Sequence, residues 1–140
     1  MLTVDANIWV AAYDPRDRFH SPSVRFLRQV AEGDLRLHGP AFLIVEVACA
    51  LARRAADGAA GAAAGNRLRQ HPALTLHAVD DAMLAASNEI GVRQLLRGAD
   101  ALYAATAMLA DAPLVSWDDE LVSRVGAVTP ESWLALRGEA

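Results

Sequence analysis

The chain has 140 residues, of which 54% are hydrophobic and 21% charged, and its formal net charge at pH 7 is −4. This composition excludes a disordered or fibrous protein, and the length predicts one domain over residues 1–140. No stretch approaches the ~20 consecutive apolar residues of a membrane span, and no basic N-terminal segment precedes an apolar run. We therefore expect a cytoplasmic protein with no membrane contact. The single cysteine, Cys49, excludes an internal disulfide, and its apolar neighbours predict that it is buried.

Short apolar runs alternate with helix-like segments, which is typical of an α/β fold with a mostly parallel sheet flanked by helices. About five short strands are predicted, over residues 2–4, 35–38, 74–79, 113–117 and 127–129. Helices are predicted over residues 21–33, 40–58, 80–87 and 99–113. The first of these has Ser21 as its expected N-cap and Pro22 at its first position. Glycines in "DGAAGAAAGN" predict a hinge or a loosely packed helical hairpin.

Four acidic residues stand out against apolar or strand-end surroundings. Asp5 follows the strand "LTV", and Asp118 follows "PLVSW". Because ligands of open parallel sheets bind beyond the carboxyl ends of the strands, both positions favour a functional site. Glu46 lies within the apolar helix segment "FLIVEVACAL", and Asp100 follows Gly98 at the start of another helix. A carboxylate in such a segment is either paired or lines a cleft.

Each acid also has a purely structural interpretation. Asp5, Asp100 and Asp118 could cap turns or helices, and Glu46 could pair with Arg53 or Arg54. Gathered at one edge, however, four carboxylates would repel one another strongly, because a like-charge pair at ~4 Å costs ~4 kcal/mol at an effective dielectric of ~20. A divalent cation would relieve this repulsion, and Mg²⁺ and Mn²⁺ prefer oxygen ligands.

The motifs "VDANIWV", "PAFLIVE", "RGADALYAATA" and "LVSWD", in this order and spacing, resemble the PIN-domain ribonucleases of the VapC toxin type found in bacterial toxin-antitoxin pairs. The resemblance covers nearly the whole chain. It implies a PIN-like α/β fold and an endoribonuclease that cleaves RNA with Mg²⁺ or Mn²⁺. The positions that match the family's acidic quartet, as catalytic residues and metal ligands, are Asp5, Glu46, Asp100 and Asp118. Asn7 and Ser116 match its supporting polar residues.

One departure concerns the last acid. Trp117 separates Ser116 from Asp118, and two further acids, Asp119 and Glu120, follow directly. Either Asp118 or a neighbouring acid could therefore complete the quartet. Asp118 is the expected one because it comes first after the strand.

The resemblance also implies partners: an RNA substrate, a cognate antitoxin protein and a second copy of the chain in a homodimer. Arg97 is the candidate RNA-binding residue, although it could equally be a helix-surface arginine. Trp9 and Trp117 could stack on bases or pack in the core. Trp9, Tyr13 and Phe42 could form a groove for an antitoxin helix, with core packing as the alternative.

Four other classes of protein are alternatives on the sequence. A PIN-like RNA-processing nuclease outside a toxin-antitoxin pair would have the same acids, and an inert protein-binding module could retain them. A phosphotransfer enzyme with an aspartate nucleophile usually has a second aspartate two residues later, where this chain has Asn7. A receiver-type signalling domain uses a lysine, and the chain contains none.

Overall fold

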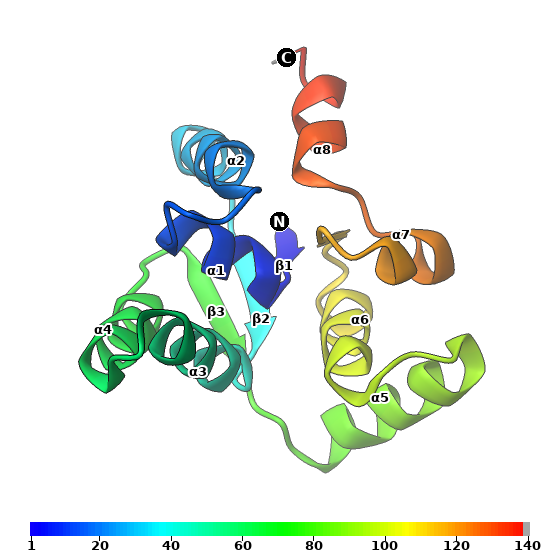
Figure 1. Ribbon diagram of the computed structural model, residues 1–140. Helices are drawn as coiled ribbons and strands as arrows, with labels where there is room; N and C mark the ends of the chain where they lie inside the picture. Colours follow the sequence, from blue (N-terminus) through cyan, green and yellow to red (C-terminus); the bar gives the residue numbers. More distant parts are fainter. Residues whose placement is uncertain (139–140) are drawn as a thin grey trace.

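Four short parallel strands form the centre of the fold in the computed structural model, which describes residues 1–138 (Figure 1). They are β1 (Leu2–Val4), β2 (Leu37–Pro40), β3 (Leu74–His77) and β4 (Leu114–Val115). Their order in the sheet is β3-β2-β1-β4, and all neighbours are parallel. Since parallel strands need crossover connections, the helices between them cover the sheet.

Eight helices lie around this sheet within the described residues. They are α1 (Ala6–Tyr13), α2 (His20–Glu32), α3 (Leu43–Ala55), α4 (Gly58–Arg69), α5 (Asp81–Gln94), α6 (Gly98–Ala110), α7 (Asp119–Val125) and α8 (Pro130–Leu136). Figure 1 shows α1 to α4 on one side of the sheet and α5 to α7 on the other. Helix α6 contacts β1, β2 and β4, and α8 packs against α2. No helix of residues 1–138 is long and apolar enough to cross a membrane.

The predicted α/β fold with a parallel sheet is confirmed, with one strand fewer than expected. The segment 127–129 contributes only a single parallel bridge, between Val128 and Val115. Gly126 before it has a positive φ, and Pro130 after it begins α8, so the extended segment is confined to the three residues between them. β1 has the predicted bounds, β3 and β4 are shorter than predicted, and β2 begins later, at Leu37.

The glycine-rich segment forms α4, which packs tightly against α3, so the predicted helical hairpin is present, but the expected loose packing and the alternative of a hinge are wrong. A Cβ added at Gly61 would lie 2.4 Å from the Ala48 carbonyl oxygen and 2.6 Å from the Ala52 Cβ. The absence of a side chain at Gly61 therefore allows the two helices to approach closely. Composition alone suggested looseness because it does not show which face of α4 meets a neighbour.

Replacement of Gly61 by alanine is expected to destabilise the protein. Alanine would gain up to ~1 kcal/mol of helix propensity, but overpacking against backbone typically costs ~1–3 kcal/mol. The matched control is Gly58→Ala in the same helix, where an added Cβ meets nothing within 4 Å. Thermal unfolding should give a lower melting temperature for Gly61→Ala and an equal or higher one for Gly58→Ala. Equal effects of the two substitutions would contradict the close helix packing.

Two further local predictions are wrong. Cys49 is exposed, because it lies one turn after the exposed Val45 on the outer face of α3, whereas Val47 and Leu51 face the core. Ser21 is not the N-cap of α2, because the helix begins at His20.

Candidate active site

Asp5 lies at the carboxyl edge of the sheet, directly between β1 and α1. Its backbone N–H donates to the Val115 carbonyl of β4, which fixes the residue beside the neighbouring strand. The residue occupies the N-cap position of α1, but its side chain makes no capping hydrogen bond. Instead the carboxylate accepts a 2.6 Å hydrogen bond from the Ser116 hydroxyl, and the residue is only 6% exposed. The capping interpretation therefore does not explain this acid.

The Ser116 hydroxyl connects the first and last acids of the predicted quartet. It donates to Asp5, accepts from Asn7 Nδ2 at 3.1 Å and accepts from the Asp118 backbone N–H at 3.0 Å. Its one proton and two lone pairs are thus all used. Asn7 is held in turn, because its Oδ1 accepts from the Trp117 N–H. Asn7 and Ser116 therefore have positions suited to supporting Asp5.

Substitution of Ser116 by alanine is expected to destabilise the protein by ~1–3 kcal/mol, because it leaves buried polar groups without a partner. It should also raise the pKa of Asp5 further, since the Ser116 hydrogen bond lowers that pKa. Ser123→Ala is the control, because Ser123 is an exposed serine on α7. Thermal unfolding measured against pH would show both effects, and a Ser116→Ala curve identical to that of the control would contradict the role of Ser116.

Glu46 points from the first turn of α3 toward Tyr103 of α6. Glu46 Oε1 and the Tyr103 hydroxyl are both buried, and neither has a hydrogen-bond partner that meets standard geometry within residues 1–138. The two groups are nonetheless close enough that Glu46 raises the pKa of Tyr103, as burial does more strongly. Burial is also the main cause of the raised pKa of Glu46. The alternative in which Glu46 pairs with Arg53 or Arg54 is not found among the ion pairs of residues 1–138, where Arg54 binds Asp14 and Asp17.

Asp100 and Asp118 are joined by one arginine. Arg97 donates from Nε to Asp100 at 2.8 Å and from a terminal nitrogen to Asp118 at 2.6 Å. Asp100 is the third residue of α6 rather than its N-cap, which is Arg97. Asp118 does cap α7, since its Oδ1 accepts from the Glu120 N–H. The Arg97 side chain is 69% exposed, so this cation lies at the rim of the site.

Three of the four acids influence one another electrostatically. The pKa of Asp5 is raised to about 7, first by burial, and further by the charges of Glu46 and Asp100. Asp100 likewise raises the pKa of Glu46. The structure therefore brings Asp5, Glu46 and Asp100 together, with Asp118 linked to them through Ser116 and Arg97. All are carboxylates from different elements that meet at one edge of the sheet.

The ligand atoms that these residues offer are of the kind that a hard divalent cation binds. The donors are carboxylate oxygens, which Mg²⁺ and Mn²⁺ prefer, and one of them, Glu46 Oε1, is buried without a partner. A cation would relieve the repulsion from Glu46 and Asp100, which adds to the effect of burial on the pKa of Asp5. Within residues 1–138, no three acidic, histidine or cysteine side chains are already arranged to hold an ion. Two of the acids are turned toward Arg97 instead.

Some side chains differ from their predicted roles. Trp9 is 1% exposed and packs in the core, so it can neither stack on RNA bases nor line a surface groove. Tyr103, which sequence reasoning missed, lies one turn after Asp100 on the same face of α6, and that i, i+3 spacing was the available signal.

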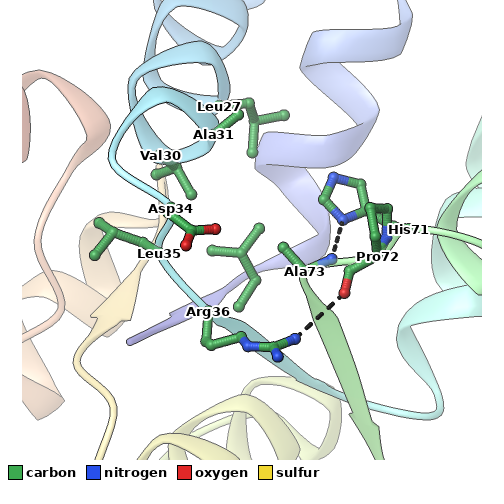
Figure 2. A pocket seen from close by; sticks show the side chains of 10 residues that line it. Leu27, Val30, Ala31, Asp34, Leu35, Arg36, His71, Pro72 and Ala73 are labelled. Carbon is green, nitrogen blue, oxygen red and sulfur yellow. Dashed lines mark hydrogen bonds between the residues drawn. The ribbon is translucent and has the colours of Figure 1, made fainter.

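A separate cavity lies at the opposite edge of the sheet, between α2 and the segments that lead into β2 and β3 (Figure 2). Leu27, Arg36 and His71 are among the residues that line it, and Figure 2 shows Arg36 donating to the Pro72 carbonyl. Because these segments precede the strands, the cavity is at the amino edge, away from the acids. It does not contribute to the candidate site.

The parallel sheet and the carboxylates at its carboxyl edge define an α/β domain with a candidate hydrolytic centre. A profile of the PIN domain family matches residues 2–128, so the chain belongs to this family, whose members are generally nucleases. Among curated proteins, none matches the sequence significantly.

Solved structures share the fold. The VapC20 toxin of Mycobacterium tuberculosis, described as cleaving the sarcin-ricin loop, has a TM-score of 0.76 at 20% identity, covering 91% of this chain and 97% of that one. VapBC2 of Rickettsia felis, bound to a DNA fragment from its promoter, has a TM-score of 0.68 at 12% identity, covering 91% and 96%. A toxin-antitoxin complex of Klebsiella pneumoniae has a TM-score of 0.64 at 18% identity, covering 93% and 98%.

Proposed function

We propose that the protein is a metal-dependent endoribonuclease in which Asp5, Glu46, Asp100 and Asp118 hold Mg²⁺ or Mn²⁺. The observation that carries the proposal is the convergence of three carboxylates, from the end of β1, from α3 and from α6, close enough that the charges of Glu46 and Asp100 add to the burial that raises the pKa of Asp5. A structural role alone gives no reason to collect like charges beside a buried glutamate oxygen without a partner. Membership of a nuclease family supports the same function.

The chain's own residues have distinct parts in this proposal. The bound ion would supply a water nucleophile and would neutralise charge on the phosphodiester. Asp5 is held by Ser116, which itself is held by Asn7, so its carboxylate has a fixed direction. Burial of Asp5 and Glu46 keeps water from screening their charges. No histidine or covalent intermediate is needed.

Incubation of the purified protein with single-stranded RNA tests the proposed activity. Cleavage should require Mg²⁺ or Mn²⁺, stop with a chelator, and be lost in Asp100→Asn. Cleavage that continues in the presence of chelator, or undiminished in Asp100→Asn, would exclude this mechanism. A well-folded protein that binds no metal would favour the inert binding module instead.

Arg97 is proposed to bind the RNA backbone beside the acids. Its guanidinium is exposed and lies at the rim of the site, where it holds Asp100 and Asp118. Arg97→Ala should weaken RNA binding and reduce the slope of log affinity against log salt by about 1, as loss of one phosphate contact does. Arg93→Ala, on the exposed surface of α5, is the control. An unchanged salt slope in Arg97→Ala would exclude the contact.

We also propose that the nuclease is a cytoplasmic toxin restrained by a cognate antitoxin. The fold shared with VapC20 and with two toxin-antitoxin complexes supports this, as does the danger of free RNA cleavage to the host. Exposed apolar side chains on α5 and just after it, including Val92 and Leu95, support a homodimer. Growth arrest on expression, relieved by the neighbouring small reading frame and by Asp5→Asn, would support the toxin. A harmless monomer that cleaves RNA would favour a general RNA-processing nuclease.

A further inference from the structure

A cavity of about 460 Å³ adjoins the candidate active site on the side of α2. The residues that line it include Asn7 and Asp118 of the candidate site, and also Arg18, Phe19 and Trp117. Its size is within the range of pockets that hold small ligands. It therefore offers room for a group attached to a phosphate that lies at the acids.

Two aromatic rings in this cavity form a rigid parallel stack. The rings of Phe19 and Trp117 lie 4.3 Å apart, with 7° between their planes. Trp117 is fixed by a 2.9 Å hydrogen bond from its Nε1 to the Ser23 hydroxyl. Phe19 is fixed at the start of α2, where its backbone N–H donates to Asp17 at 2.8 Å. The two rings are thus held from both sides and need not move themselves to receive a flat ligand.

The Arg18 guanidinium also lies over the Phe19 ring. Its carbon is 4.5 Å from the ring centroid, and because Trp117 is stacked in parallel on one face, we place the arginine on the other. Arg18 is exposed, and within residues 1–138 it pairs with no carboxylate. An exposed cation–π contact is weak, and stacking of a nucleobase on an aromatic ring is stronger. A base can therefore displace the arginine from Phe19.

We propose that Phe19, backed by Trp117, is a subsite for one unstacked nucleobase of single-stranded RNA, next to the phosphate that is cut. The base stacks on Phe19, and Arg18 moves to a phosphate of the backbone. Stacking tolerates any base, because each has a flat face. This inference rests on the proposed ribonuclease function and adds a substrate feature to it: the RNA must present a base that is free to leave its neighbours.

The test measures how tightly the full chain binds two labelled probes in the presence of chelator. One probe is a uridine decamer, and the other is an abasic ribose-phosphate decamer. Both carry the same backbone charge, so the ratio of their affinities isolates the contribution of the bases. We expect the protein to bind the uridine decamer about tenfold more tightly and Phe19→Leu to lose most of that preference. Phe19→Trp should retain it, because the aromatic face remains.

Tyr13→Leu is the matched control. Tyr13 also lies under an exposed arginine, since the Arg67 guanidinium carbon is 4.5 Å from its ring centroid, but it lines a different cavity, without the acids. This variant should keep the preference for the uridine decamer. Arg18→Ala should also keep the preference for the uridine decamer. It should lower the affinity for both probes and reduce the slope of log affinity against log salt.

Two outcomes would overturn the subsite. One is a Phe19→Leu variant that keeps the preference; the other is a Tyr13→Leu variant that loses it equally. Should Phe19→Leu fail to fold, loss of the preference in Phe19→Trp or in Arg18→Ala would contradict the proposal instead. If the protein cleaves RNA but binds both probes equally, the subsite is contradicted and the proposed nuclease function stands. If Phe19→Leu loses the base preference but the protein cleaves no RNA, the nuclease function is contradicted and the subsite stands.

Discussion

Asp5→Asn is expected to lower metal-dependent RNA cleavage by at least ~10²-fold and, in the metal-free protein, to raise the melting temperature at neutral pH. Loss of activity follows from removal of a proposed metal ligand. The gain in stability follows from the site itself, because the buried Asp5 carboxylate is charged at high pH beside Glu46 and Asp100. An amide at this position keeps an oxygen for the Ser116 hydroxyl and carries no charge.

The direction of the pH dependence follows from the raised pKa of Asp5. Its pKa is about 7 in the folded protein, whereas an unfolded aspartate titrates near ~3.9. The folded state therefore holds the proton more tightly, and this carboxyl group favours folding below pH ~4. That contribution is lost as the pH rises through about 7, and it amounts to at most ~4 kcal/mol.

Melting curves in chelator at pH 5 and pH 8 measure this effect. The unsubstituted protein should lose more stability between the two pH values than Asp5→Asn does. Asp119→Asn, which removes an exposed carboxylate of α7, is the control and should behave like the unsubstituted protein. A pH dependence that is the same in all three proteins would contradict the buried charge at Asp5.

Asp118→Asn is expected to reduce cleavage by ~10–100-fold, whereas Asp119→Asn should leave it nearly unchanged. Asp118 shares Arg97 with Asp100 and donates its backbone N–H to Ser116, which places it at the acids. Asp119 is exposed in the first turn of α7. Asparagine is a good N-cap, so Asp118→Asn preserves the helix start and removes only the charge.

Rates of RNA cleavage at saturating Mn²⁺ decide between the two acids. Equal melting temperatures of both variants would show that the fold is intact. A large loss in Asp119→Asn with normal activity in Asp118→Asn would assign the fourth position to Asp119 instead.

The sequence indicated the position of a candidate site residue where that residue follows the end of a predicted strand. Asp5 and Asp118 were predictable because a short apolar run points to a strand, and parallel strands end at a common edge. Ser116 and Asn7 came from the resemblance, and the structure shows that Asn7 donates to Ser116, which in turn donates to Asp5.

Features that depend on helix phase or on distant contacts were not predictable. The phase of α3 was misjudged at Cys49 because nearly every residue around it is apolar, so no polar face marked the outside. The meeting of Glu46 with Tyr103 depends on how α3 and α6 approach each other. The Phe19–Trp117 stack joins residues almost 100 positions apart.

Parallel titrations with Mn²⁺ test the central claim most directly: one follows the melting temperature and the other follows RNA cleavage. If the acids form one metal centre that carries the activity, both curves should rise over the same Mn²⁺ concentrations, and both responses should be lost in Asp5→Asn. A melting temperature that rises equally in Asp5→Asn, or cleavage that needs no Mn²⁺, would contradict the account.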